Sequence, residues 1–230
     1  MKKILVLDVE TANDTEHAIV YDIGYKIIDL NGKVYVQRSF VIRDTFVYMR
    51  DVVNQAFYAH KIPEYVNDIR NGSRTMVDFM QARNTILNDM RKFNCYTVAA
   101  YNCNFDRNAL NVTLRYLTKS AFRFYFPFNV RFVDIWNMAC NTICQSSDYK
   151  TFAETYRHYS NHGKNYKSSA EVVYQFLTND PLFEEEHKGL DDVNIECEIM
   201  LHCLNNGGSM MPIKRTCWQL VKRAALVVAR

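Results

Sequence analysis

The sequence predicts an α/β domain with a mixed central sheet, on three observations. Residues 3–8 form a short, continuously apolar run that is typical of a strand covered on both faces. Two strand-like segments, 20–28 and 33–42, flank Asn31-Gly32, a dipeptide that favours a tight antiparallel hairpin. After residue 72, helical and strand-like patterns alternate, which is typical of an α/β domain. An antiparallel meander followed by helix–strand units is therefore expected.

The other elements follow in chain order. Residues 45–72 are polar and aromatic without strand alternation, and we expect a loop with short helices there. Apolar residues at helical spacing predict a helix within 75–93, and a buried strand is expected at 96–101. The remaining prediction is a helix at 106–117, a strand at 131–135, and helices at 136–144, 151–159, 168–177 and 191–204.

The length and composition indicate one globular domain with a C-terminal extension. The 230 residues are enough to bury a sizeable core, and the 7 Gly and 4 Pro argue against long disordered linkers. The one flexible joint is Asn205-Asn-Gly-Gly-Ser209. We therefore expect a domain over 1–205 and a basic extension over 206–230.

Charge is distributed unevenly along the chain. The formal net charge of +3 is too small to indicate a nucleic-acid partner by itself. Two stretches, 107–131 and 205–230, each contain five Lys or Arg and no Asp or Glu. Each stretch is either a surface beside a phosphate backbone or an ordinary solvated face. The many aromatic residues likewise suit base stacking or, more commonly, a bulky core.

Seven cysteines and the absence of long apolar runs indicate a reducing compartment. The N-terminal apolar run is too short for a secretory signal and ends in Asp8, and no run approaches the ~18 residues that span a bilayer. A cytoplasmic protein with reduced thiols and no membrane contact is therefore expected. Cys140 and Cys144 share a four-residue spacing with His158 and His162, but buried thiols explain them better than zinc does.

Asp8 and Glu10 follow the first apolar run, with one residue between them. Alternate residues of a strand point to the same face, so both carboxylates project together. Neighbouring carboxylates repel each other, and a hard cation relieves this because Mg²⁺ and Mn²⁺ prefer oxygen ligands. The short pattern occurs by chance in many proteins. Its place at the carboxyl end of a buried strand, where ligands of α/β sheets gather, strengthens the prediction of a metal site.

Two later segments also bring acidic side chains to the ends of predicted elements. Asp106 closes a segment between a predicted strand and a helix, where helix capping is the alternative role. Asp192 enters the last predicted helix on the face of Ile195 and Ile199, so its carboxylate points inward and requires a partner or a metal. His187 lies just before this helix and is either a general base or an ordinary surface histidine.

The order and spacing of these segments resemble the DEDDh exonuclease family, which includes the proofreading subunits of bacterial replicases, RNase T and oligoribonuclease. The matching segments are Leu7-Asp-Val-Glu-Thr11, Tyr101-Asn-Cys-Asn-Phe-Asp106 and His187-Lys-Gly-Leu-Asp-Asp192. Asp22-Ile-Gly24 and Val133-Asp-Ile-Trp136 are also similar to strand sequences of the family. The resemblance covers about residues 1–205 and looks most like the small exonucleases carried by bacteriophages.

Three positions depart from the family pattern. Tyr101 stands where His is frequent, Thr11-Ala12 where Thr-Thr or Thr-Gly is usual, and Gly189 where Ala is common. None of these removes a ligand, so they bear on substrate fit more than on activity. Within the acidic doublet, spacing from His187 favours Asp192 as the ligand and leaves Asp191 as a charge near the helix N-terminus.

The resemblance implies the ribonuclease H-like fold and phosphodiester hydrolysis with two Mg²⁺ or Mn²⁺ ions about 4 Å apart. In that scheme Asp8 bridges both ions, and Glu10 and Asp192 complete one site. Asp106 holds the second ion, largely through waters. His187 accepts the proton of the attacking water, which suits a group that titrates near neutral pH.

Substrate contacts are implied for three further residues. Thr11 and Ala12 would contact the terminal 3′ nucleotide through backbone and side chain. Asn102 would position the second motif, although a role as a plain turn residue has equal weight.

The function expected from the resemblance is a 3′–5′ exonuclease on single-stranded ends, with DNA favoured over RNA. An exonuclease for RNA or oligoribonucleotides is the alternative, because details of the pocket sense the 2′-hydroxyl. An alternative of another class is a nucleic-acid-binding protein with little catalysis, or a subunit attached to a polymerase or other replication partner. The extension 206–230 would dock such a partner or fold back on the domain, and the second is favoured.

Overall fold

The computed structural model describes residues 2–121, 123–160 and 162–223, and its core is a six-stranded mixed sheet. The strand order is β4-β3-β2-β1-β5-β6. Strands β1 (Lys3–Ala12), β2 (Ile19–Asp29) and β3 (Val34–Ile42) form an antiparallel meander. Strand β5 (Thr97–Ala100) runs parallel to β1, β6 (Arg131–Asp134) runs parallel to β5, and β4 (Thr75–Val77) runs parallel to β3. The predicted mixed α/β sheet is confirmed.

The β2–β3 hairpin forms where the Asn31-Gly32 pair predicts it. Gly32 has φ +83°, a left-handed conformation that a residue without Cβ adopts readily. Asp29 stabilises the turn, because its Oδ1 accepts hydrogen bonds from the backbone N–H of Asn31 at 2.9 Å and of Lys33 at 3.1 Å.

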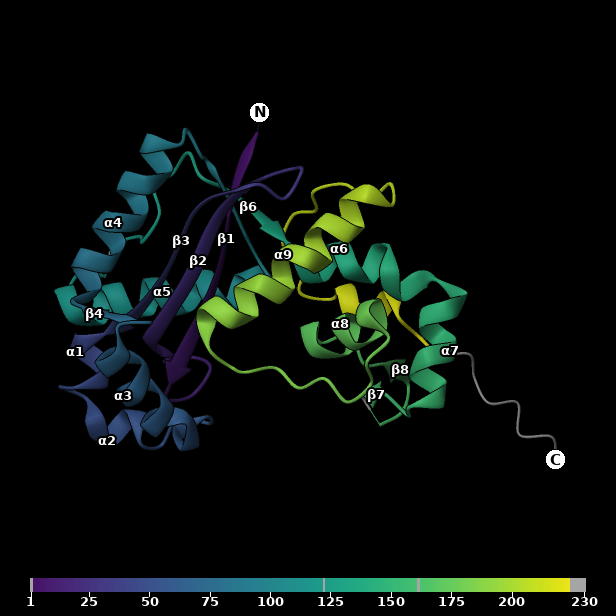
Figure 1. Cartoon of the computed structure of the whole chain (residues 1–230), viewed down its shortest axis with the longest axis horizontal. Helices are drawn as coiled ribbons and strands as arrows, with labels where there is room; N and C mark the ends of the chain where they lie inside the picture. Colours follow the sequence, from purple (N-terminus) through teal and green to yellow (C-terminus); the bar gives the residue numbers. More distant parts are fainter. Residues whose placement is uncertain (1, 122, 161, 224–230) are drawn as a thin grey trace.

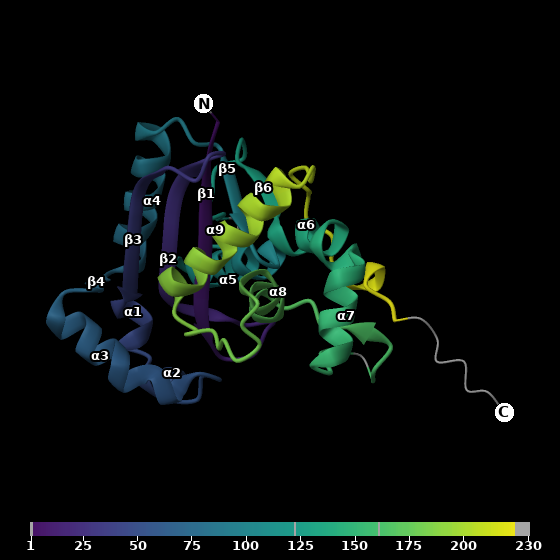
Figure 2. The same ribbon diagram turned by 45° about the vertical axis from the view of Figure 1, so that its right-hand side comes forward.

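Helices cover both faces of the sheet, and β1 contributes to both layers (Figure 1). Leu5, Leu7 and Val9 belong to the core that packs on helices α4 (Phe79–Lys92) and α5 (Cys103–Thr118). Ile4 and Val6 face the other core, which includes helices α6 (Ile135–Asn141), α8 (Ala170–Thr178) and α9 (Gly189–Asn205). The α9 ribbon crosses the sheet on this second face (Figure 2). Even-numbered side chains of β1 therefore point toward α9.

Short elements surround this framework. Residues 43–71 hold α1 (Arg43–Phe46), α2 (Arg50–Val53), the 3₁₀ turn η1 (Ala59–Lys61) and α3 (Ile62–Asn71), as expected of a loop with short helices. A second group of elements follows α6: η2 (Ile143–Gln145), α7 (Ser147–Thr155), and the two-residue strands β7 (Tyr159–Ser160) and β8 (Asn165–Tyr166). Strands β4, β7 and β8 were not predicted, because two or three residues carry no measurable periodicity. Residues 75–77 were instead assigned to the start of a helix.

The described part of the C-terminal extension packs on the domain. The backbone N–H of Asp134 donates to the carbonyl of Met211 at 2.9 Å, and Asn137 Nδ2 donates to the carbonyl of Pro212 at 2.9 Å. Cys217, in the 3₁₀ turn η3 (Cys217–Leu220), and Val221 are fully buried in the core beside α6. Of the predicted basic residues of this extension, Arg230 lies outside the described residues.

The cysteines are free thiols in the described part of the chain. All seven cysteines are buried and none forms a disulfide in the described chain. The two groups of metal-ligand atoms found among residues 2–121, 123–160 and 162–223 contain no cysteine. In the same ranges, no helix combines the length and the apolar character that crossing a bilayer requires.

Candidate active site

Strand β1 delivers two carboxylates to the face that α9 covers. Asp8 and Glu10 both occupy even positions, and the register of pairing with β2 shifts between Glu10 and Thr11. Glu10 is buried, and one oxygen of Asp8, Oδ2, is buried without a hydrogen-bond partner. The unpaired oxygen is costly unless a ligand satisfies it.

Helix α5 brings Asp106 against the same strand. The chain leaves β5 at Ala100, turns through Asn102 in a left-handed conformation with φ +62°, and enters the helix at Cys103. One turn later the buried Asp106 accepts a hydrogen bond at Oδ1 from the backbone N–H of Val9, at 3.3 Å. The carboxylate therefore ties α5 to β1 at the residue between Asp8 and Glu10, which is a larger role than helix capping.

The loop before α9 positions His187, and the first turn of α9 positions Asp192. His187 has φ +49°, and its ring stacks on that of Tyr58 with centroids 3.9 Å apart and planes 14° apart. Asp192 is buried with Oδ1 unpartnered. Its neighbour Asp191 instead pairs through Oδ2 with Arg74 Nη2 at 3.1 Å. Asp192 therefore belongs to the site, and Asp191 belongs to an ion pair outside it.

A buried anchor holds the start of α9 against β2. Asp22 Oδ2 accepts hydrogen bonds from the backbone N–H of Gly189 at 2.9 Å, from Tyr65 Oη at 2.9 Å and from Arg74 Nη1 at 2.7 Å. A Cβ on Gly24 would lie 2.1 Å from the carbonyl carbon of Gly189, and one on Gly189 would lie 2.6 Å from the nitrogen of Gly24. Glycine at 189 is therefore required by the close approach of two backbones.

The five predicted site residues line one pocket of about 710 Å³. Within it, ligand atoms of Glu10, His187 and Asp192 lie within 4.8 Å of one another. Asn102 also lines the pocket, whereas Thr11 and Ala12 do not. Ala12 is fully buried in a cluster with Tyr21 and Tyr65, so only its backbone is available to a ligand.

Three further glutamates surround the predicted set. Glu196 lies one turn after Asp192 on α9, and its Oε1 accepts a hydrogen bond from the backbone N–H of Tyr101 at 3.1 Å while Oε2 is buried and unpartnered. Glu171 and Glu185 place carboxylate oxygens within 4.8 Å of a His187 ring nitrogen. The i, i+4 spacing from Asp192 is the sequence signal that would have found Glu196.

Burial and mutual repulsion raise the pKa of every carboxylate in this pocket for which a shift is resolved. Desolvation, followed by repulsion from neighbouring acids, raises the pKa of Glu10 to about 10 and that of Asp192 to about 8. Desolvation also raises the pKa of Asp106 to about 8 and that of Glu185 to about 7. The pKa of Asp8 lies well above its usual value for the same two reasons, with Glu196 as its strongest acidic neighbour.

These groups fit a hard divalent cation. Desolvation lowers the pKa of His187, so its imidazole is neutral at pH 7 and adds no compensating charge. Lys167 is the one lysine or arginine among the described residues that line the pocket. Buried oxygens without partners on Asp8, Asp192 and Glu196 are suitable oxygen ligands for Mg²⁺ or Mn²⁺. Without a cation, the raised pKa values keep several of these carboxyl groups protonated at neutral pH, and a bound cation would displace those protons.

Comparison with solved structures identifies the fold. The cell-death related nuclease 4 (CRN-4) has a TM-score of 0.54 and 12% identity, and the match covers 92% of this chain and 66% of that one. E. coli exonuclease I in complex with a 5cy-dT13 oligonucleotide has a TM-score of 0.55 and 13% identity, covering 90% of this chain and 41% of that one. The zinc-bound complex of E. coli exonuclease I with single-stranded DNA has a TM-score of 0.51 and 11% identity, and the match covers 90% of this chain and 41% of that one.

The similarity shows that the chain has the ribonuclease H-like fold found in these nuclease structures. The chain spans 66% of CRN-4 and about two-fifths of exonuclease I. No protein-family model and no curated protein matches the sequence.

Proposed function

We propose that this chain is a divalent-metal-dependent 3′–5′ exonuclease that releases nucleoside monophosphates from single-stranded ends, with DNA favoured over RNA. One observation carries the proposal. The carboxylates of Asp8, Glu10, Asp106 and Asp192 converge with a stacked, neutral histidine in one pocket on a ribonuclease H-like sheet. Structures of exonuclease I that share the fold are complexes with dA16 and dT13 oligonucleotides, which supports single-stranded DNA as the substrate.

The four carboxylates would hold two Mg²⁺ or Mn²⁺ ions. When bound, such ions lower the pKa of a water and stabilise the attacking and leaving oxygens of phosphoryl transfer. Asp8, whose pKa is raised by repulsion from Glu196 and Asp106, would contribute to both ions. Glu10 and Asp192, whose ligand atoms lie within 4.8 Å of each other, would hold one ion, and Asp106 would hold the other.

His187 would accept the proton of the attacking water. A general base must be unprotonated at the working pH, and the lowered pKa of His187 supplies the neutral imidazole. The stack on Tyr58 restricts rotation of the ring, and Glu185 Oε2 lies 4.0 Å from Nδ1, where it would stabilise the imidazolium formed.

The terminal nucleotide would lie beside Asn102 and the end of β1. Asn102 lines the pocket at the N-terminus of α5, a suitable place for a donor to the terminal sugar or phosphate. Thr11 would contribute backbone and side chain, and Ala12 its backbone alone, because its side chain is buried.

Product ladders test the proposal. The chain is incubated with 5′-labelled single-stranded DNA, duplex DNA or RNA, with Mg²⁺, Mn²⁺ or EDTA. We expect stepwise shortening from the 3′ end and release of mononucleotides, fastest on single-stranded DNA and lost in EDTA. A faster ladder on RNA would reassign the sugar preference. Absence of mononucleotides from every substrate would refute the proposal.

Two variants test the assigned residues. Asp8→Asn should abolish hydrolysis in a folded protein because a ligand charge is lost. His187→Ala should reduce turnover about 10²-fold or more, the usual contribution of a general base, while leaving metal binding intact. Full activity in Asp8→Asn would exclude the metal assignment, and an unchanged rate in His187→Ala would exclude the histidine from proton transfer.

A further inference from the structure

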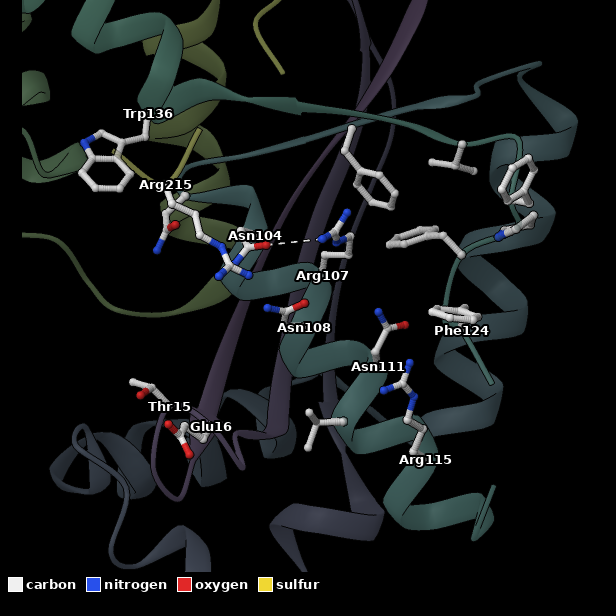
Figure 3. A pocket seen from close by; sticks show the side chains of 17 residues that line it. Thr15, Glu16, Asn104, Arg107, Asn108, Asn111, Arg115, Phe124, Trp136 and Arg215 are labelled. Carbon is white, nitrogen blue, oxygen red and sulfur yellow. Dashed lines mark hydrogen bonds between the residues drawn. The ribbon is translucent and has the colours of Figure 1, made fainter. Parts of the chain in front are cut away.

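A second and larger hollow lies next to the candidate active site. It has a volume of about 1070 Å³ and runs along α5, between residues 124–132 on one side and the region of Trp136 and Arg215 on the other (Figure 3). Asn102 and Trp136 line both this groove and the carboxylate pocket. A ligand that occupies the pocket therefore has a continuous path into the groove.

The groove carries cationic side chains, in contrast to the acidic pocket. Arg107, Arg115 and Arg215 line it, against Glu16 as the lining acid. Within the described ranges none of these arginines pairs with a carboxylate. Arg107 Nη2 donates to Asn104 Oδ1 at 3.3 Å, and Arg115 Nε donates to the carbonyl of Arg123 at 3.1 Å. Their positive charges remain available to an anionic ligand.

Polar side chains form a stripe on α5 that faces the groove. Asn104, Arg107, Asn108, Asn111 and Arg115 recur at helical spacing, and the close view shows them along one side of the helix (Figure 3). Asn111 is partly engaged, since its Oδ1 accepts a hydrogen bond from the backbone N–H of Tyr125 at 2.8 Å. Amides and guanidinium groups in such a row can donate to successive phosphates or base edges.

Aromatic rings form the facing wall. Phe128 is fully exposed and Phe124 is 62% exposed, although both are large apolar side chains. The guanidinium of Arg115 lies 5.0 Å from the ring centre of Phe124, and that of Arg107 lies 5.3 Å from the ring of Phe132. Exposed rings next to guanidinium groups are the combination that binds single-stranded nucleic acid, by base stacking and phosphate pairing.

We infer that this groove binds the single-stranded nucleic acid upstream of the terminal nucleotide. The inference rests on the proposed function, because it places the 3′ end in the carboxylate pocket. The strand would pass Asn102 and Trp136 into the groove, with bases on Phe124 and Phe128 and phosphates on Arg107 and Arg115. Trp136 is fixed for this passage by a hydrogen bond from Nε1 to Ser168 Oγ at 2.9 Å.

Binding without turnover tests the groove by itself. Fluorescence anisotropy in EDTA measures the affinity of 5′-fluorescein dT20 for the full chain and its variants. Phe124→Ala with Phe128→Ala should weaken dT20 about 10-fold or more, because base stacking contributes about 1–3 kcal/mol per base. Phe128→Ser alone, at a fully exposed position, should act in the same direction without loss of the thermal transition.

Salt dependence tests the arginines. Arg107→Ala with Arg115→Ala should reduce the slope of log affinity against log salt by about 1.4, since each lost phosphate contact with a single strand removes about 0.7. Matched controls are Leu182→Ala, an 87% exposed apolar residue, and Arg70→Ala, an exposed arginine of α3. Neither lines the groove, and both should bind dT20 as the unmodified chain does.

Hydrolysis assays test the inference about the groove separately from the proposed exonuclease activity. In Mg²⁺, the loss of kcat/KM in the phenylalanine variants should be about 10-fold greater for dT20 than for the dinucleotide dTpdT, which lacks most of the upstream nucleotides that the groove would bind. An rU20 arm measures the sugar preference. Unchanged dT20 affinity in all groove variants would overturn the inference while leaving the nuclease intact. If the groove variants bind dT20 more weakly but the unmodified chain hydrolyses no substrate, the groove is a nucleic-acid-binding site and the proposal of an exonuclease is refuted.

Discussion

Asp191 and Asp192 are adjacent and chemically identical, yet the fold gives them opposite surroundings. Successive residues of a helix are about 100° apart, so one side chain of the doublet points to the pocket and the other points away. Asp191 is half-exposed and paired with Arg74, whereas Asp192 is buried with an unpartnered oxygen and a pKa raised to about 8. Only the second has the unsatisfied oxygen that a cation would bind.

The same substitution at the adjacent residues Asp191 and Asp192 gives a test variant and a matched control. Asp192→Asn should abolish hydrolysis of single-stranded DNA and weaken Mn²⁺ binding by at least about 10-fold in isothermal titration calorimetry, because it removes a buried ligand charge. Asp191→Asn should retain both properties and lose only an ion pair with a half-exposed carboxylate. Equal activity in the two variants would remove Asp192 from the metal site.

Glu196 extends the same reasoning to a residue outside the family pattern. Its carboxyl is 3% exposed, and its pKa is raised well above the usual value by burial and then by Asp106. Glu196→Gln should therefore raise the melting temperature in EDTA at neutral pH, because glutamine does not need the proton that the buried carboxyl must take up on folding. It should also weaken Mn²⁺ binding, because it removes a carboxylate that a cation would bind. Glu198→Gln, exposed on the same helix, is the control. A lower melting temperature in EDTA for Glu196→Gln would contradict this account of the buried carboxyl.

At the scale of elements, the site depends on how closely α9 approaches β2. The backbone of Gly189 contacts that of Gly24, and Asp22 holds the first N–H of α9. His187 and Asp192 flank this contact in the chain, so the contact sets the position of both. The sequence identified Gly189 as a departure from the family pattern, but its physical reason requires the partner strand.

Gly24→Ala tests this contact. The new Cβ would meet backbone atoms at 2.1 Å, which cannot be relieved by a side-chain rotation. We expect destabilisation at the upper end of the ~1–3 kcal/mol typical of overpacking, seen as a lower urea midpoint, with a loss of activity as α9 is displaced. Ile23→Val, a buried neighbour on the same strand, should cost about 0.5–1.5 kcal/mol and keep activity. Full stability in Gly24→Ala would show that the two backbones separate freely.

The elements that the sequence predicted well are those with a strong local pattern. The β1 run, the Asn31-Gly32 hairpin and the long α4, α5 and α9 helices each have periodicity or turn chemistry of their own. Glu196 had a local signal in its i, i+4 spacing from Asp192, whereas Glu185 lies in the loop before α9, and no local pattern predicts its place beside Glu171 and His187. Substrate contact through backbone and side chain is predicted for Thr11 and Ala12, and the strand directs the side chain of Ala12 into the core, which leaves its backbone for that contact.

At the scale of the whole molecule, the small net charge conceals two adjoining regions of opposite sign. Acids gather in the pocket beside β1, and arginines gather in the groove along α5. Of the basic residues in stretch 107–131, Arg107 and Arg115 line the groove, while Lys119, Arg123 and Arg131 do not. Arg215 joins them because the C-terminal segment folds back over α6. From composition alone, each basic stretch could be either a surface that binds nucleic acid or an ordinary solvated face.

The pocket also makes the stability of the whole molecule depend on pH and on metal. An unfolded Asp or Glu has a pKa near 4, whereas Glu10, Asp106 and Asp192 have folded pKa values of about 10, 8 and 8. Between these values the folded chain holds protons that the unfolded chain has released. The free energy of unfolding therefore falls as pH rises through this window. His187, whose pKa is lowered, contributes in the opposite sense at pH values below about 6.5.

We accordingly expect the melting temperature in EDTA to fall between pH 6.5 and 8. Added Mn²⁺ should raise it, and more so at pH 8, because a protonated carboxyl must release its proton before it can bind a cation. Differential scanning calorimetry at several pH values, with EDTA or Mn²⁺, measures both effects. Asp192→Asn should flatten the slope in EDTA and reduce the gain from Mn²⁺, while Asp191→Asn, which removes only a smaller contribution to the pKa of Asp192, should change both much less. A melting temperature in EDTA that rises from pH 6.5 to 8 would mean that these carboxylates are not held protonated in the folded chain.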